Sequence, residues 1–320
     1  MAKIPKPLKV MLTLLLIGGC LYFLGREFYT HLDQIRAMTF TLRPDQLALG
    51  LVFTLLAYLS LTYAWVYGLK GISHHSLRFW DAIPVVNLPS LAKYIPGKMW
   101  SYLIQMVWLE KRGFPKSLVL FNNLLVVIVS IVASVVMGAL FFFWSFEQYP
   151  LSWRGAILGL VLLGDLVFVL SYRWCLHLAT TVMNRVLKKS INLVDAPARV
   201  LINLQLIFGV IYLFFGLGTL YTCRGFGLNL GHDFLTPLIG SMALADTIGF
   251  LALFAPGGIG VKESVFYVAI KHLIPENMAL MIPVFSRLVA IIAEVILGLV
   301  AVGILHKAGV RILRSKTPTP

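Results

Sequence analysis

The sequence predicts an all-α polytopic membrane protein, with six full transmembrane helices and two re-entrant broken-helix hairpins in an inverted repeat. The first observation is composition: the 320 residues are 59% hydrophobic and 12% charged, with a mean hydropathy of +0.88, which excludes an ordinary soluble domain. The second is that two long apolar regions are each interrupted by Pro, Gly and Lys. The third is that most Lys and Arg residues fall in loops on one side of the membrane if both interrupted regions turn back instead of crossing.

Apolar runs give the order of the elements, and each half of the chain reads as two spans, a broken element and one span. The predicted spans are residues 8–25, 46–69, 117–144, 154–172, 200–221 and 278–305. The predicted broken elements are residues 81–108 and 234–272, and the amphipathic segments 27–43 and 173–199 are predicted to lie in the membrane interface. These elements divide a single membrane domain into a first half, residues 1–150, and a second half, residues 151–320.

The two interruptions place helix-breaking residues and charges where the flanking sequence predicts hydrocarbon. Residues 254–263 read Phe-Ala-Pro-Gly-Gly-Ile-Gly-Val-Lys-Glu, and residues 93–98 read Lys-Tyr-Ile-Pro-Gly-Lys. Pro and repeated Gly do not continue a helix. Non-helical backbone at membrane depth persists only where protein buries it or water lines it. Ionisable groups at that depth are candidates for function.

Charge and length indicate that each broken element turns back instead of crossing. If both turn back, 17 Lys and Arg residues lie on the cytoplasmic side and 6 lie outside, with both termini cytoplasmic. Each arm of the first hairpin is about eleven residues, or about 16 Å of helix, which reaches about the middle of a hydrocarbon core about 30 Å thick. Three crossings per half invert the second half, so its hairpin enters from outside. This is the pattern of transporters with inverted repeats.

The candidate site consists of the two hairpin tips and the charges near them. A helix restarts after each Pro-Gly, so its free N–H groups and positive dipole end favour an anion such as phosphate. The predicted headgroup-binding residues are Lys93, Lys98, Lys262, Arg287, Gly97, Gly257 and Gly258. The predicted ion- or proton-coupling residues are Asp246, Glu263 and Glu294.

Structural roles remain open for several of these charges. Lys93 and Lys98 are also consistent with snorkelling to the cytoplasmic surface. Lys262 with Glu263, or Arg287 with Glu294, can form neutralising pairs. Asp165 is more consistent with a hydrogen bond to a neighbouring helix. We expect no catalytic residue, no cofactor and no metal site.

The interrupted segments resemble those of the lysylphosphatidylglycerol synthase transmembrane-region family, also described as flippase-like integral membrane proteins. The matching stretches are residues 93–100 and 256–263, with Ser286-Arg287-Leu288 further on. The resemblance implies a multi-pass protein of the bacterial inner (cytoplasmic) membrane that moves a lipid. The best-known members also carry a cytosolic aminoacyl-transfer domain, which this sequence lacks, so lipid aminoacylation is not implied. Asn122-Asn123 stands where the family is expected to have an acidic-basic pair, so no role is transferred there.

These features favour a lipid flippase or transporter, not an enzyme, that moves an anionic or lipid-linked phosphate headgroup. A polytopic transferase acting on a polyprenyl-phosphate substrate is one alternative. A scaffold for a lipid-synthesis enzyme is another, and that enzyme would then be a partner. The expected ligand is a membrane lipid. Nucleic acid is not expected, because the net charge of +14 is spread along short loops.

Overall fold

A computed structural model of the chain describes residues 29, 41–73, 75–91, 100–145, 149–187, 196–252 and 255–307. These residues form helices joined by turns and loops, without a β-strand among them. Six segments are long and apolar enough to cross a membrane, so the chain is a multi-pass membrane protein. They are Pro44–Ile72, Lys116–Ser145, Leu151–Tyr172, Ala198–Gly225, His232–Leu251 and Asn277–Lys307.

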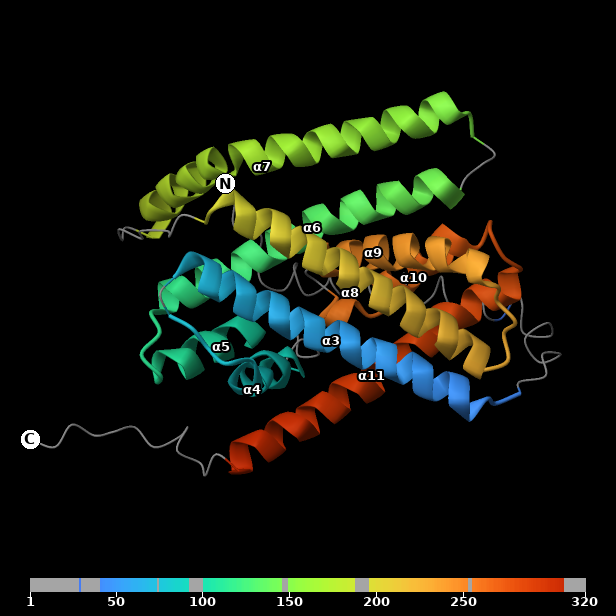
Figure 1. Ribbon diagram of the computed structural model, residues 1–320, viewed down its shortest axis with the longest axis horizontal. Coiled ribbons are helices and arrows are strands. Elements are labelled where there is room, and N and C mark those ends of the chain that lie inside the picture. Colours follow the sequence, from blue (N-terminus) through green and yellow to red (C-terminus); the bar gives the residue numbers. More distant parts are fainter. Residues whose placement is uncertain are drawn as a thin grey trace, which may run out of the picture.

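Five of the six predicted spans are confirmed as long apolar helices. They correspond to α3 (Pro44–Ile72), α6 (Lys116–Ser145), the first part of α7 (Leu151–Leu187), α8 (Ala198–Gly225) and α11 (Glu276–Lys307) (Figure 1). The predicted first span, residues 8–25, lies outside the described residues, and so does most of the segment 27–43. The remaining long apolar segment, His232–Leu251, was expected to be the first arm of the second hairpin.

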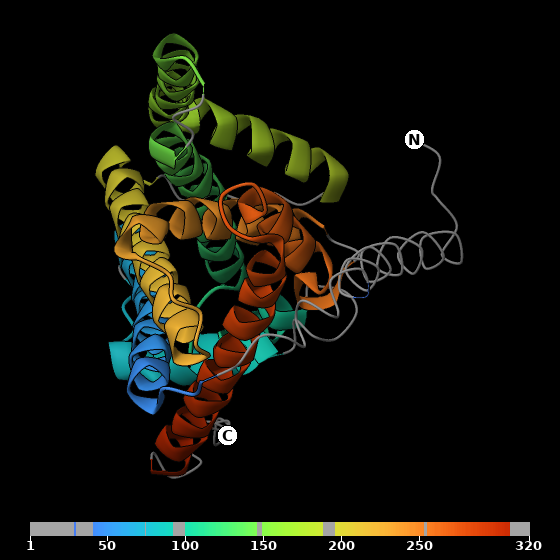
Figure 2. The same ribbon diagram turned by 90° about the vertical axis from the view of Figure 1, so that its right-hand side faces the viewer.

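Helix α7 contains both the span predicted to end at Tyr172 and the first part of the predicted interfacial helix, joined without the expected break. The chain stays helical from Leu151 to Leu187, and Figure 2 shows that this long helix changes direction partway. Neither Pro nor Gly occurs between Tyr172 and Leu187, so nothing in the sequence ends the helix at that point. Residues 188–195 lie outside the described part.

Each broken element contains at least one short helix. The first contains α4 (Phe79–Ser90) and α5 (Trp100–Glu110), and its predicted tip, residues 92–99, lies outside the described residues. The second contains the 3-10 turn η2 (His232–Phe234), α9 (Leu235–Leu251), the 3-10 turn η3 (Pro256–Gly258) and α10 (Val261–Ile270). At 1.5 Å per residue, α4, α5 and α10 are about 15–18 Å long, too short to cross a core about 30 Å thick.

Helices α3 and α8 form the most extensive helix pair among the described residues and run antiparallel, side by side in both overall views (Figures 1 and 2). Gly50, near the start of α3, faces Thr222, near the end of α8. At the other end, the Asn203 amide donates to Tyr67 Oη at 2.5 Å. Small residues allow the two backbones to approach, as in many membrane helix pairs.

The remaining helices pack around this pair in two apolar clusters. One cluster joins α3, α6 and α8 around Leu69, Leu125 and Leu204. The other joins α9, α10 and α11 around Leu238, Phe266 and Ile282. Two contacts between the halves matter for the site: α6 packs against α9, and α11 packs against α4.

The close approach of α3 and α8 predicts a specific sensitivity to added volume. A Cβ atom at Gly50 would lie 2.9 Å from the backbone nitrogen of Thr222, whereas a Cβ at Gly159 in α7 would meet nothing within 4 Å. We expect Gly50→Ala to lower stability by about 1–3 kcal/mol, because overpacking separates the two backbones. The thermal unfolding midpoint of the detergent-solubilised protein measures this loss. Equal midpoints for Gly50→Ala and the control Gly159→Ala would contradict the packing.

Candidate functional site

A cavity of about 370 Å³ lies between the two broken elements and the long helices. Its walls come from α3, α4, α5, α6, α8, α9, η3, α10 and α11. Tyr58 is 14 residues from either end of α3, and Tyr212 is 14 residues from the start of α8. Because both tyrosines line the cavity, it lies at mid-length of the long helices, far from their ends.

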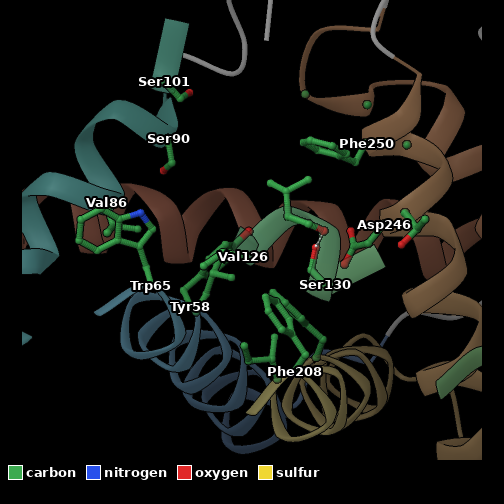
Figure 3. Close-up of a pocket in the computed structure, with 18 of the residues that line it drawn as sticks. Tyr58, Trp65, Val86, Ser90, Ser101, Val126, Ser130, Phe208, Asp246 and Phe250 are labelled. Carbon is green, nitrogen blue, oxygen red and sulfur yellow. Dashed lines mark hydrogen bonds between the residues drawn. The ribbon is translucent and has the colours of Figure 1, made fainter. Parts of the chain in front are cut away.

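The charged side chains that line the cavity are Asp246, Lys262, Arg287 and Glu294, all from the second half of the described chain. Gly257 and Gly258 of the turn between α9 and α10 line the same end. In Figure 3, Asp246 and Phe250 lie on one side of the cavity, and Trp65, Ser90 and Ser101 lie on the other. The cavity therefore has a charged end at Asp246, Lys262 and Arg287. The opposite end, formed by the described residues of α3 to α6, has only uncharged side chains and is called the uncharged end; Glu294 of α11 lies apart from the charged end.

Lys262 and Asp246 form an ion pair within the second broken element. Lys262 Nζ contacts Asp246 Oδ1, and the two side chains are 20% and 28% exposed. The pair forms because α10 folds back onto α9: a Cβ atom at Gly249 would lie 3.0 Å from the Lys262 Cβ, so only glycine fits at this crossing without a shift. The pair thus connects α9 and α10 close to the turn.

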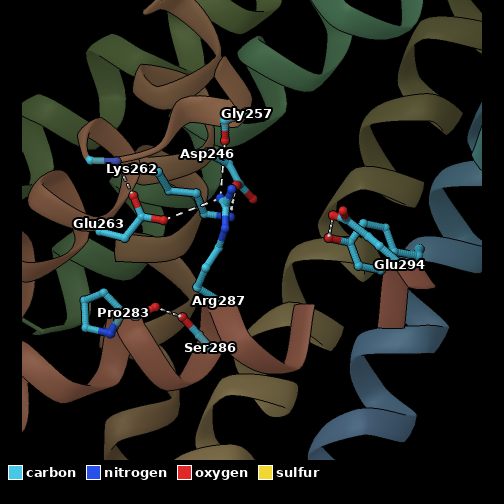
Figure 4. Close-up of polar contacts among 10 residues, drawn as sticks. Asp246, Gly257, Lys262, Glu263, Pro283, Ser286, Arg287 and Glu294 are labelled. Atoms are coloured by element: carbon cyan, nitrogen blue, oxygen red, sulfur yellow. Dashed lines mark hydrogen bonds and ion pairs between the residues drawn. The ribbon is translucent and has the colours of Figure 1, made fainter. Parts of the chain in front are cut away.

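Arg287 fastens α11 to the same turn (Figure 4). Its Nη1 donates to the Gly257 carbonyl oxygen at 3.2 Å and lies 3.4 Å from Glu263 Oε1. Glu263 also caps α10, because its Oε2 accepts the Gly260 N–H at 2.8 Å. Gly257 and Gly260 both have positive φ, at 58° and 80°, which favours glycine. One arginine and one glutamate therefore satisfy backbone groups that the break leaves without helical partners.

Glu294 is separate from this cluster, as Figure 4 shows. It is 6% exposed, and Tyr58 Oη donates to its Oε1 at 2.5 Å. This contact joins the middle of α11 to the middle of α3. A second polar contact between the halves is made by the hydroxyls of Ser134 on α6 and Thr247 on α9.

The uncharged end of the cavity comes from the first half. Trp65 Nε1 donates to Asn123 Oδ1 at 2.7 Å, and the neighbouring Asn122 Nδ2 donates to the Trp65 carbonyl oxygen at 3.0 Å. Gln105 of α5 completes this end with a side chain that is 5% exposed. Sequence reasoning assigned no role to these amides. The signal that would have identified them is a polar side chain inside an apolar helix.

The structure brings together most of the predicted site residues that it describes. Lys262, Arg287, Gly257, Gly258, Asp246 and Glu294 line the cavity, and Glu263 contacts Arg287 behind it. Lys93, Gly97 and Lys98 lie outside the described residues. Among the described residues, no group of three or more His, Cys, Asp or Glu side chains that could hold a metal ion is found.

The pairing of the charges differs from both pairs considered in the sequence analysis. Lys262 pairs with Asp246 instead of Glu263, because adjacent residues on a helix do not face each other. Arg287 pairs with Glu263 instead of Glu294, which is seven residues and about 10.5 Å further along α11. The structural reading of Asp165 holds: its Oδ1 accepts from Gln205 Nε2 of α8 at 2.6 Å.

Comparison with known proteins identifies no family and no relative for this chain. No family model and no curated protein matches the chain. Membership of the family that the interrupted segments resemble is therefore not shown.

The Lys262–Asp246 pair predicts a loss of stability that a second substitution reverses in part. Asp246→Asn leaves an ammonium unpaired in a site that is mostly buried, so we expect a loss of about 1–3 kcal/mol, less than for a fully buried pair. Lys262→Gln in the same chain removes that charge and should recover part of the loss. A double-mutant cycle on thermal unfolding in detergent gives the coupling energy.

The exposed pair between Glu110 and Lys116 is the matched control. Its atoms are 2.9 Å apart, but its side chains are 51% and 54% exposed. Its coupling should fall within about 0–1 kcal/mol. A coupling energy for Lys262 and Asp246 no larger than that of this surface pair would contradict a buried ion pair.

Proposed function

We propose that the protein is a membrane lipid transporter that moves an anionic or lipid-linked phosphate headgroup across the bilayer. The single observation that carries the proposal is the mid-length cavity where the two broken elements meet. Cations and the start of a helix line it at one end, which is the chemistry that binds phosphate. The lipid tails would stay in the surrounding hydrocarbon while the headgroup passes through the cavity.

Helix length supports the re-entrant interpretation for α4, α5 and α10, whereas the first arm of the second element, His232–Leu251, is long enough to cross a membrane. Helices α4, α5 and α10 are 12, 11 and 10 residues long, so none of them reaches across a bilayer. Ser90 and Ser101, at the facing ends of α4 and α5, line the same cavity as Gly257 at the α9–α10 turn. The ends of both broken elements therefore converge on the mid-length of the long helices, as the re-entrant interpretation requires.

A regular spacing of cavity residues supports an inverted repeat. Six pairs of lining residues, one from each half, are separated by 160 positions in the sequence, and the same spacing separates Pro96-Gly97 from Pro256-Gly257. The pairing of helices is also reciprocal: α6 packs on α9 as α11 packs on α4. The six pairs are Val86 and Asp246, Asn87 and Thr247, Ser90 and Phe250, Tyr102 and Lys262, Val127 and Arg287, and Ser130 and Ala290.

The ion pairs supply a way to bind and release phosphate. A phosphate offers the same acceptor geometry as a carboxylate, so it can replace Asp246 at Lys262 and Glu263 at Arg287. Without substrate, the two carboxylates neutralise the cations and lower the cost of burying them. Asp246, Glu263 and Glu294 are then available to couple transport to an ion or a proton.

Two alternatives make different demands. A scaffold for a lipid-synthesis enzyme needs no internal binding space. The fact that Lys262 and Arg287 each pair with a carboxylate would suit such a role. However, a cavity of about 370 Å³ among these charges favours transport, because it falls within the size range of ligand pockets. A transferase would modify a polyprenyl-phosphate substrate, and product formation by the purified protein would support it.

Headgroup translocation in reconstituted vesicles tests the proposal. The vesicles contain fluorescent phosphatidic acid, and an impermeant quencher is added outside, where it reaches only lipid in the outer leaflet. Fluorescence from the inner leaflet should therefore fall faster in vesicles that contain the protein than in protein-free vesicles. We expect Arg287→Ala and Lys262→Ala to slow translocation about tenfold or more, because each removes a charged hydrogen bond to phosphate. Arg287→Lys keeps the charge but loses the two-pronged contact, so an intermediate rate is expected.

The control is Lys116→Ala, which removes an exposed cation outside the cavity. This variant should translocate at the wild-type rate. Wild-type protein that moves no phosphate lipid would overturn the transporter proposal. Unchanged rates in both Lys262→Ala and Arg287→Ala would overturn only the residue assignment.

A further inference from the structure

Two buried amides at the uncharged end of the cavity have atoms without a hydrogen-bond partner in the described structure. They are Gln105 Oε1 on α5 and Asn123 Nδ2 on α6, and the side chains are 5% and 4% exposed. Both residues line the cavity. An unsatisfied buried polar group costs about 1–3 kcal/mol, so two of them on residues in the wall of one cavity indicate a place that a ligand completes.

The orientation of the Asn123 amide is set by its neighbour. Trp65 Nε1 is only a donor, so the atom that it contacts at 2.7 Å must be the Asn123 oxygen. The Asn123 nitrogen is therefore the atom that remains, and it offers a donor. Gln105 Oε1 offers an acceptor. The site thus presents one donor and one acceptor from two adjacent helices.

Two other polar side chains at this end, Asn87 and Ser90, already have partners. Asn87 Nδ2 donates to Thr62 Oγ1 and to the Ile83 carbonyl oxygen, each at 3.0 Å. Ser90 Oγ donates to the Asn87 carbonyl oxygen at 2.7 Å. Trp65 and Tyr102 add aromatic surface. Within the described residues of α3 to α6, every lining side chain is uncharged.

This set of groups selects one kind of ligand chemistry. A hydroxyl can accept from the Asn123 amide and donate to the Gln105 carbonyl oxygen at the same time. Among the described residues that line this end, no cation lies beside the Gln105 oxygen, so a second phosphate there would face an acceptor. An aliphatic group would leave both amide atoms unsatisfied.

We propose that this end of the cavity is a subsite for hydroxyl groups, and that the substrate is a phosphate lipid whose headgroup is a polyol. The inference rests on the proposed function, because it assumes that phosphate occupies the end with Lys262 and Arg287. The headgroup then extends from the phosphate to the two amides, where Trp65 and Tyr102 pack against its carbon skeleton. A single small headgroup fits a cavity of about 370 Å³.

Two short-chain phosphate lipids, one with and one without a polyol headgroup, test this subsite. Binding of dioctanoyl phosphatidylinositol and dioctanoyl phosphatidic acid is measured on the purified wild-type protein in detergent. We expect phosphatidylinositol to bind about tenfold more tightly, because two additional hydrogen bonds form at about 0.5–1.5 kcal/mol each. Gln105→Met and Asn123→Leu remove these bonds with little change in volume. Each should weaken phosphatidylinositol binding several-fold and leave phosphatidic acid binding unchanged.

The matched control is Gln205→Met, which makes the same substitution on α8, where Gln205 contacts Asp165 outside the cavity. It should keep the wild-type preference. Thermal unfolding of each variant identifies those that fail to fold, and the second amide variant then provides the comparison.

The outcomes separate this inference from the transporter proposal. Equal wild-type affinity for the two lipids, or a preference that survives both Gln105→Met and Asn123→Leu, would overturn the polyol subsite and leave phosphate transport standing. No binding of either lipid would contradict both. A preference lost only in the two amide variants supports the subsite.

Discussion

The break between α9 and α10 is the constraint on which the rest of the site depends. A chain that stops being helical inside a membrane exposes backbone groups, and these must find partners within the protein. Arg287 donates a hydrogen bond to the Gly257 carbonyl oxygen, and Glu263 accepts one from the Gly260 N–H. The same two side chains are held 3.4 Å apart, so satisfying the backbone also fixes a cation and a carboxylate beside the cavity. The contacts that satisfy the backbone of the turn therefore also position the charged groups beside the cavity.

The two halves contribute different chemistry to similar positions. Asp246, Lys262 and Arg287 are separated by 160 residues from Val86, Tyr102 and Val127, which are uncharged. Under the proposed inverted repeat, the two halves are related but unequal, which accounts for the different chemistry of the two ends. Under the transporter proposal, one end would hold phosphate and the other would hold the part of the headgroup that carries hydroxyls. Alternating access would then move both halves around a fixed polar centre.

Local sequence was sufficient for most helices and insufficient for their contacts. Apolar runs predicted α3, α6, α8 and α11 within a few residues, because burial in hydrocarbon is a property of each run. The apolar span in α7 ends at Tyr172 as predicted, but the helix itself continues to Leu187, since a change in composition does not by itself end a helix. One alternative left open by the sequence paired Lys262 with its neighbour Glu263, whereas the fold pairs it with Asp246 on another helix. Gln105 and Asn123 received no role, because a single amide cannot be interpreted until the wall that it faces is known.

The sequence by itself determined the membrane class, the location of the apolar helices and the points where Pro and Gly interrupt them. It also identified Lys262, Arg287, Asp246 and Glu294 as charges at unusual depth. Only the tertiary structure decided which carboxylate faces which cation, and which uncharged side chains share a cavity with them. Hydrophobicity and backbone conformation are properties of neighbours along the chain. Pairing and enclosure depend instead on the packing of helices that lie far apart in sequence, and no local pattern specifies that packing.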